Sequence, residues 1–142
     1  MLRGIKTLHL RMQQHCINGE KIAHWLRAHP GVSKVYWPGF EDQPGYAIAK
    51  KQMRGFGGMI SFELKKEGVE EVNRVLSSTK LFSLAESLGG VESLINHPAT
   101  MTHASIPREE RIKNGLSDSL IRLSVGVEDA EDLIEDLKQA IG

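Results

Sequence analysis

Met59-Ile60-Ser61-Phe62-Glu63-Leu64 alternates apolar and polar side chains, the pattern of a β-strand with one buried face. The glycine-rich residues 55–58 precede it and free the backbone for a bend before the strand begins. Residues 120–125 are apolar and partly β-branched around a single arginine, which favours a second strand. These two segments predict that the domain is built on a sheet.

Helical spacing of apolar residues surrounds the two strands. A long helix is expected over residues 7–29, ended by His29-Pro30-Gly31, because proline restricts the residue before it and glycine tolerates the turn. Shorter helices are predicted over 45–52, 68–77, 108–113 and, after a cap at Glu128-Asp129, along the C-terminal stripe to Ile141. Further strands are predicted at 32–36 and 80–85, and the segment from Gly90 to Pro98 is ambiguous.

This order of elements predicts the fold class. Strands and helices that alternate with short glycine turns indicate an α/β domain, specifically a two-layer α+β arrangement with one small sheet and helices on one face. The length of 142 residues fits one domain over 1–142. The sheet order cannot be read from the pattern.

Composition excludes several classes of function. Eighteen basic and eighteen acidic residues are interspersed, so no field attracts nucleic acid or an anionic membrane surface. No apolar run approaches the roughly 20 residues of a membrane span, and no leader pattern stands at the N-terminus. Cys16 is the only cysteine, so no disulfide can form within the chain. A soluble, cytoplasmic protein without nucleic-acid or membrane partners is expected.

A few polar residues at the ends of apolar segments are candidates for chemistry. Arg122, inside an apolar strand, either snorkels at a sheet edge or stands in a cleft as a bidentate partner for a carboxylate. Glu86 and Ser87 precede a glycine pair that lets the backbone approach a ligand, although an ordinary turn has the same pattern. Thr102 is either a turn hydroxyl or a site residue.

Other chemistries are disfavoured. The histidine pairs 24/29 and 97/103 do not suit one helix face and lack further ligands, so no metal site is predicted. Residues 55–58 do not continue into a phosphate-binding motif, and no base accompanies Ser83 or Ser87 as in a hydrolase. Residues 77–80, Ser-Ser-Thr-Lys, look like a Schiff-base lysine segment, but no phosphate or ring partners stand near Lys80, which is interpreted as structural.

Read end to end, the chain resembles the C-terminal domain of the pyridoxal-phosphate enzymes of cysteine and methionine metabolism, the cystathionine γ-synthase, cystathionine γ-lyase and methionine γ-lyase family. The resemblance covers essentially the whole chain. Its motifs are Leu-Arg-Gly-Ile-Lys-Thr-Leu at 2–8, His-Pro-Gly-Val at 29–32, Gly-Phe-Gly-Gly-Met at 55–59, Ala-Glu-Ser-Leu-Gly-Gly at 85–90, His-Pro-Ala at 97–99, Met-Thr-His-Ala-Ser at 101–105 and Leu-Ile-Arg-Leu-Ser-Val-Gly at 120–126.

The resemblance implies roles for the candidate residues. Arg122 would bind the α-carboxylate of an amino-acid substrate, a task that its planar fork suits. Ser87 would help to fix that carboxylate or the Schiff-base lysine, and Thr102 would line the same cleft. Glu86 resembles the cystathionine-handling branches and would meet a distal ammonium group. No catalytic residue, cofactor-binding residue or metal ligand is assigned within these residues.

The resemblance also implies what must come from elsewhere. Pyridoxal 5'-phosphate would be bound by an N-terminal, cofactor-binding domain that is absent from 1–142, so this piece would be inactive alone. The intact enzyme would be a homo-oligomer in which paired subunits share active sites and dimers pair into tetramers. The alternative is a stand-alone amino-acid-binding or dimerisation module without catalysis, which would cover its surface with polar residues. Met12, Trp25 and Phe40 are the expected contributors to an apolar docking patch.

Overall fold

The computed structural model describes residues 2–142 as one five-stranded sheet with helices. The strand order is β1-β2-β5-β4-β3. Neighbouring strands are antiparallel except for β3 and β4, which run parallel. The strands are β1 (Val32–Tyr36), β2 (Met59–Leu64), β3 (Ser83–Leu84), β4 (Leu94–Asn96) and β5 (Leu120–Ser124). The mixed sheet confirms the predicted fold class and supplies the order that the pattern did not reveal.

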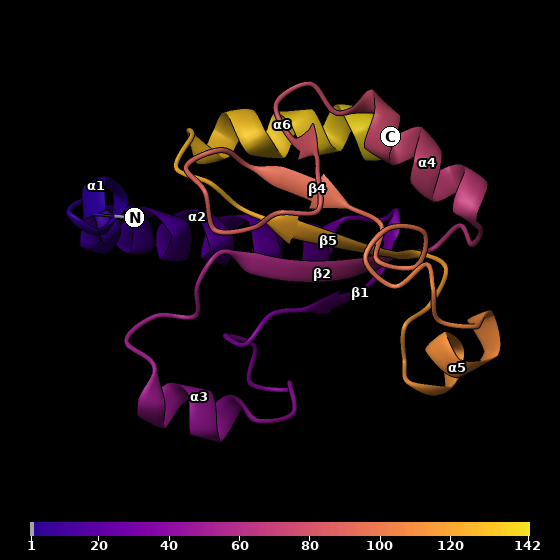
Figure 1. Ribbon diagram of the computed structural model, residues 1–142, viewed down its shortest axis with the longest axis horizontal. Helices are drawn as coiled ribbons and strands as arrows, with labels where there is room; N and C mark the ends of the chain where they lie inside the picture. Colours follow the sequence, from indigo (N-terminus) through magenta and orange to yellow (C-terminus); the bar gives the residue numbers. More distant parts are fainter. Residues whose placement is uncertain (1) are drawn as a thin grey trace.

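Helices α2 (Leu8–Ala28), α4 (Val69–Ser78) and α6 (Ala130–Ile141) cover one face of this sheet. Figure 1 shows α4 and α6 side by side over the sheet and α2 along it. Apolar side chains of the three helices pack on every second residue of the central strands. This core includes Ile22, Leu26, Ile60, Phe62, Val72, Val75, Ile95, Ile121, Leu123, Leu133 and Leu137. Burial of alternate strand residues is the physical reason for the pattern at 59–64.

Three short helices stand outside this core. They are α1 (Leu2–Ile5), α3 (Tyr46–Gln52) and α5 (Arg108–Lys113). In Figure 1, α3 and α5 project away from the sheet, on the side opposite to α4 and α6. The ranges predicted for α2, α3, α4, α5, α6, β1, β2 and β5 agree with the structure to within about two residues, whereas α1 was not predicted. Across residues 2–142, no helix combines the length and apolar character that a bilayer span requires.

The strand predicted at 80–85 is wrong in extent, because β3 comprises only Ser83 and Leu84. The carboxylate of Asp136 on α6 accepts the backbone N–H groups of Lys80, Leu81 and Phe82 at 2.8–3.0 Å. These N–H groups are therefore engaged by a side chain and cannot join a ladder. Tertiary contact, rather than local preference, shortens the strand.

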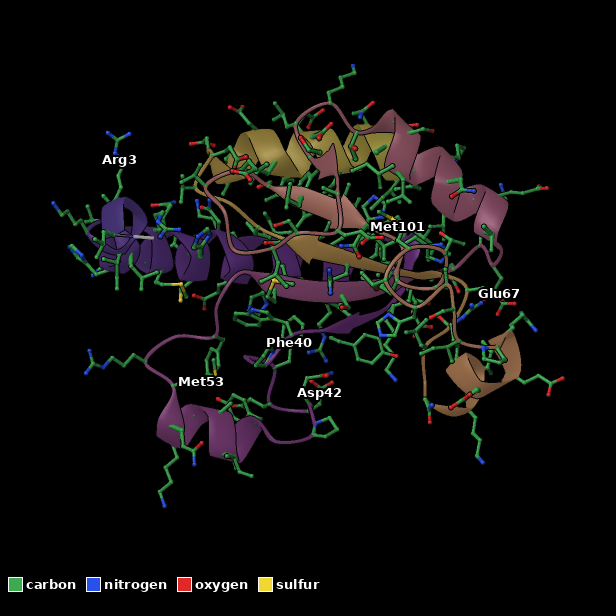
Figure 2. The ribbon with its side chains drawn as sticks, in the orientation of Figure 1. Arg3, Phe40, Asp42, Met53, Glu67 and Met101 are labelled. Atoms are coloured by element: carbon green, nitrogen blue, oxygen red, sulfur yellow. The ribbon has the colours of Figure 1, made fainter. Side chains whose placement is uncertain are left out.

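The expected apolar docking residues also need correction. Phe40 is buried, since its ring packs edge to face with Trp37 and His24. Trp25 is half-buried and packs against the core, and only Met12 is exposed. Figure 2 places Phe40 beneath the sheet between β1 and α3, while Arg3 of α1 projects away from the body.

Candidate functional site

The face of the sheet opposite to the three helices carries a row of polar residues in register. Tyr36 on β1 pairs with Ser61 on β2, Ser61 with Arg122 on β5, and Arg122 with Asn96 on β4. Residues that pair across strands point to the same face, so these four side chains line up across the sheet. We call this set the polar row. We call this side of the sheet the open face: Tyr36, Ser61 and Arg122 are half-buried on it, whereas Asn96 is buried.

Arg122 is half-buried at the centre of the sheet. Its Nη2 donates to the carbonyl oxygen of Glu86 at 3.2 Å, so the side chain crosses β4 and reaches the segment that follows β3. Its Nε is buried and has no hydrogen-bond partner among residues 2–142. The guanidinium therefore lies along the open face rather than at a sheet edge, and its Nη1, which has no hydrogen bond within residues 2–142, is left for a ligand.

The segment 85–92, here called the Glu-Ser loop, returns across the open face from β3 to β4. Asn96 Nδ2 donates to the carbonyl oxygen of Ala85 at 3.2 Å, and the backbone N–H of Gly89 donates to Ser124 Oγ at 2.8 Å. Gly89 has φ +75°, a left-handed conformation that favours glycine. The loop is thus attached to β4 at its start and to β5 near its middle.

A second polar network holds the end of β5 against the same loop. The carboxylate of Glu128 accepts two hydrogen bonds from Ser93, one from the backbone N–H at 2.6 Å and one from the side-chain hydroxyl at 2.9 Å. Ser93 Oγ in turn accepts the N–H of Gly126 at 2.8 Å. Asn18 on α2 donates to the carbonyl oxygens of Gly126 and Glu128 at 3.1 and 2.7 Å. Helix α2, strand β5 and the start of β4 are therefore joined by hydrogen bonds beside the site.

Of the predicted residues, Glu86 contacts Arg122 through its backbone, and Ser87 follows it in the Glu-Ser loop. The carbonyl oxygen of Glu86 accepts the Arg122 hydrogen bond, and both side chains are exposed. Within residues 2–142, no side chain forms a hydrogen bond with the carboxylate of Glu86 or with the hydroxyl of Ser87. The two groups are free to meet a ligand that approaches the open face.

Thr102 is exposed in the segment that follows β4, where its hydroxyl bonds His103 Nδ1 at 2.8 Å. Within residues 2–142 no hydrogen bond joins it to Arg122 or to the Glu-Ser loop. Its neighbour His97 is buried and bonds Thr100 Oγ1 and the carbonyl oxygen of Asp118. Burial lowers the pKa of His97, which favours the neutral ring as a structural element. Hydrogen bonding therefore ties Glu86 to Arg122, whereas neither Ser87 nor Thr102 has a hydrogen bond to another predicted residue within residues 2–142.

Sequence reasoning missed Asn96 and the other partners of Arg122 in the polar row. Ser61 could have been found, because the alternation at 59–64 assigns it to the polar face of β2. Asn96 lies in a segment whose pattern was ambiguous, and all three residues of β4 are buried. Only the pairing of Asn96 with Arg122 in the β4–β5 register shows that Asn96 belongs to the site.

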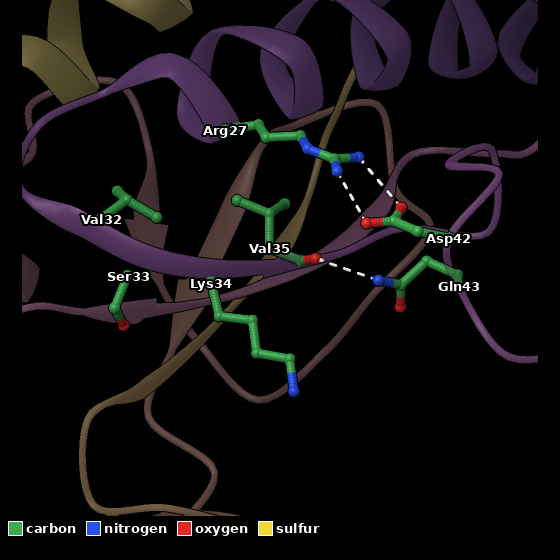
Figure 3. Close-up of a pocket in the computed structure, with 7 residues that line it drawn as sticks. All are labelled: Arg27, Val32, Ser33, Lys34, Val35, Asp42 and Gln43. Atoms are coloured by element: carbon green, nitrogen blue, oxygen red, sulfur yellow. Dashed lines mark hydrogen bonds and ion pairs between the residues drawn. The ribbon is translucent and has the colours of Figure 1, made fainter.

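A hollow at the free edge of β1 lies apart from the polar row, and Figure 3 shows its lining. Arg27 donates to both carboxylate oxygens of Asp42 at 3.0 and 2.7 Å, and Gln43 donates to the carbonyl oxygen of Val35. Hydrogen bonds from Arg27 hold the pKa of Asp42 below its usual value. These groups satisfy one another, so the hollow is interpreted as structural.

The donors of this chain do not fit pyridoxal phosphate by themselves. Lys34 is on the open side of β1, but its ammonium lies 4.6 Å from the centre of the Tyr36 ring, two strands away from Arg122. Lys80 lies in the turn that Asp136 holds against α6, away from the open face. The polar row instead suits a carboxylate. Residues 2–142 contain no group of three His, Cys, Asp or Glu side chains that could hold a metal ion.

The comparisons with known proteins agree with this architecture. The family model described as Cys/Met metabolism PLP-dependent enzyme matches residues 1–142, so the chain belongs to this family. Curated relatives include a cystathionine beta-lyase from Coxiella burnetii, 58% identical over 99% of this chain, and a cystathionine gamma-lyase from Bacillus subtilis, 57% identical over 99%. An L-methionine gamma-lyase from Fusobacterium nucleatum is 54% identical over 99% of the chain.

A solved structure gives the same fold. The crystal structure of cystathionine gamma-lyase from Lactobacillus plantarum complexed with L-serine superimposes with a TM-score of 0.90 at 52% identity and covers 97% of this chain. The chain in turn spans 36% of that structure, and 36%, 37% and 35% of the three curated relatives named above. The chain therefore corresponds to about a third of the length of these proteins.

Proposed function

We propose that this chain is the substrate-side domain of a pyridoxal-phosphate-dependent transsulfuration enzyme. The intact protein would catalyse elimination or replacement on sulfur amino acids or O-acyl homoserine. The observation that carries the proposal is Arg122, half-buried at the centre of the open face, with Nη1 free of hydrogen bonds within residues 2–142 and Nη2 beside the Glu-Ser loop. Two parallel N–H groups of a guanidinium match the two oxygens of a carboxylate, the anionic group that every amino-acid substrate carries.

Each residue has a distinct task in this proposal. Arg122 binds the substrate α-carboxylate, and the Ser87 hydroxyl donates a further hydrogen bond to it. The exposed carboxylate of Glu86 meets an ammonium at the far end of a substrate such as cystathionine. On the family resemblance, Thr102 would line the same cleft. Together these contacts orient the bond to be broken before any chemistry occurs.

Pyridoxal phosphate, held by a part of the protein outside residues 1–142, would supply the electron sink for carbanion chemistry. Exposed apolar residues support the presence of such a docking part. Seven of the thirteen exposed large apolar side chains within residues 2–142 lie on α1, on the N-terminal half of α2 and just after α3: Leu2, Ile5, Leu8, Leu10, Met12, Ile17 and Met53. A groove beside them exposes mostly apolar surface, and its lining combines Met12, Cys16, Ile17 and Met53 with the polar residues His9, Gln13 and Arg54. An evolved free module would cover such a surface with polar residues.

This surface therefore weighs against the alternative of a stand-alone amino-acid-binding module. The further proposals are a cytoplasmic location and a homo-oligomer whose paired subunits share active sites. Both follow from the family resemblance, and the apolar surface on α1 and α2 is compatible with subunit pairing as well as with domain docking.

A chimera tests the function directly. Residues 2–142 would replace the matching segment of the cystathionine gamma-lyase from Bacillus subtilis, which is 57% identical over this region. We expect a soluble protein that binds pyridoxal phosphate and forms a 2-oxo acid from L-cystathionine, whereas the isolated chain forms none. A chimera that binds the cofactor but fails to turn over any sulfur amino acid or O-acyl homoserine would contradict the proposal.

A further inference from the structure

Asn96 contains a buried acceptor that nothing within residues 2–142 uses. The residue is 2% exposed, and its Oδ1 is buried without a hydrogen-bond partner. Its Nδ2 donates to the carbonyl oxygen of Ala85, which fixes the orientation of the amide, because a flipped amide would set two carbonyl oxygens against each other. An unpaired buried acceptor costs free energy, so the site is built for a donor that completes it.

Arg122 contains the complementary unpaired donor. Its Nε is buried without a partner, and Arg122 stands directly opposite Asn96 in the β4–β5 pairing. The two side chains extend in the same direction, because Asn96 reaches the carbonyl oxygen of Ala85 and Arg122 reaches that of the next residue, Glu86. The two side chains therefore extend from paired positions to consecutive carbonyl oxygens at the start of the Glu-Ser loop.

The burial of Nε also decides which edge of the guanidinium can meet a ligand. A carboxylate binds two parallel N–H groups, either on the Nη1/Nη2 edge or on the Nε/Nη2 edge. Because Nε is inaccessible, only the Nη1/Nη2 edge is open, and Nη2 must leave the carbonyl oxygen of Glu86 to serve it. Once the guanidinium has rotated in this way, an acceptor that bonds its Nε–H would hold it in the new orientation.

We propose that Asn96 is a positioning residue for the substrate carboxylate: its Oδ1 accepts Nε–H of Arg122 when the guanidinium turns its Nη1/Nη2 edge toward an amino acid. This inference rests on the proposed function, since it deepens the role of Arg122 in the same site. Asn96 acts through Arg122 and does not touch the reacting atoms.

The kinetic test uses the chimeric holoenzyme. Asn96→Leu keeps the volume and removes the acceptor, so we expect KM for L-cystathionine to rise about tenfold while kcat changes less than twofold and cofactor absorbance is retained. Asn73→Leu, which changes an exposed asparagine of α4, is the matched control and should leave both constants unchanged. An unchanged KM in Asn96→Leu overturns the inference.

A spectroscopic test on the chimeric holoenzyme, saturated with L-serine as in the solved relative, separates the acceptor role from the loop contact. Asn96→Asp keeps an acceptor oxygen, whereas Asn96→Asp and Asn96→Leu both lose the donor to Ala85. In the ¹⁵N-labelled holoenzyme with L-serine bound, we expect hydrogen exchange of Arg122 Nε–H to be at least about tenfold slower in the wild type and in Asn96→Asp than in Asn96→Leu, because an acceptor oxygen at position 96 protects it. Equal exchange rates would reduce Asn96 to a contact that holds the loop and would overturn the inference.

The two tests also separate this inference from the proposed function. An inactive chimera refutes the function, while the exchange rates still decide whether Asn96 orients Arg122. An active chimera in which Asn96→Leu changes neither KM nor Nε–H exchange refutes the role of Asn96 and leaves the function standing.

Discussion

Arg122 on β5 reaches across β4 to the carbonyl oxygen of Glu86, with 3.2 Å between Nη2 and that oxygen. In the chimeric enzyme, Arg122→Ala should lower kcat/KM for L-cystathionine about 100-fold, because a bidentate charge-assisted contact to the carboxylate is lost. Arg122→Lys should recover only part of this loss, since a single ammonium cannot form the fork. Steady-state kinetics with cofactor absorbance as a reference measure the effect.

The matched control for Arg122→Ala is Lys138→Ala, which removes an exposed positive charge from α6 on the other side of the sheet. It should leave kcat/KM unchanged. If both variants reduce activity alike, the effect is general electrostatics and not carboxylate binding by Arg122.

Asp136 should be the most sensitive polar residue for stability. Burial raises the pKa of this carboxyl, but the backbone N–H groups of Phe82, Lys80 and Leu81 lower it further than burial raises it. Asp136→Ala leaves those N–H groups unpaired and should cost about 2–4 kcal/mol in the free energy of unfolding. Denaturant titration measures the loss. Glu135 is the exposed neighbour of Asp136. Glu135→Ala breaks only a surface ion pair with Lys138 and should lower the free energy of unfolding by less than about 0.5 kcal/mol.

The pH dependence of stability should report on Glu71. Hydrogen bonds from Arg74 and then Lys66 hold the pKa of Glu71 at about 2, well below its ordinary value of 4.5. Because the folded-state pKa is the lower one, the stabilisation is complete above about pH 4.5 and is lost as the pH falls toward 2. Arg74 also donates to the last carbonyl oxygens of α6, at Ala140 and Ile141, so the ion pair connects α4 with α6.

Glu71→Gln should therefore flatten the decline of unfolding free energy between pH 5 and 2, which thermal or urea unfolding at a series of pH values can follow. The exposed Glu70→Gln, on the same turn of α4, should leave the slope as in the wild type. A slope that does not change in Glu71→Gln would show that another carboxylate dominates acid unfolding.

Close packing at Gly19 should make α2 intolerant of a single methyl group. A Cβ at this position would collide with the carbonyl oxygen of Gly57 and stand 3.0 Å from Cα of Gly58, and both obstacles are backbone. Gly19→Ala should thus cost about 1–3 kcal/mol through overpacking, despite the better helix propensity of alanine. Gly4→Ala, whose Cβ meets nothing closer than 3.9 Å, serves as the control and should be neutral or slightly stabilising. Calorimetry of the two variants compares them directly.

The isolated chain should not form a specific linkage with pyridoxal phosphate. Lys80 is exposed beside α6, and the Tyr36 ring and Arg122 lie on other parts of the sheet. After borohydride reduction, peptide mass spectrometry should find Lys80 modified no more than the exposed Lys138. Selective trapping at Lys80 would contradict its interpretation as a structural residue and the need for a separate cofactor-binding part.

Local pattern predicted those parts of the fold where one face is buried along a whole element. Residues 59–64 and the stripe of α6 repeat with the period of their structure, so burial of each residue follows from its position. The strand at 80–85 failed because Asp136, more than 50 residues further along the chain, captures its N–H groups. Phe40 was misplaced because aromatic contacts with Trp37 and His24 bury a residue of an irregular loop.

For the candidate site, the sequence by itself determined which groups are available: a guanidinium inside an apolar strand, a carboxylate and a hydroxyl before a glycine pair, and a threonine after a proline. Only the tertiary structure decided which of them meet. Strand register brings Asn96 opposite Arg122, and the parallel pairing of β3 with β4 returns the Glu-Ser loop across the open face, while Thr102 remains outside the hydrogen-bonded set. Such pairings depend on contacts between residues distant in sequence, which short-range periodicity does not encode.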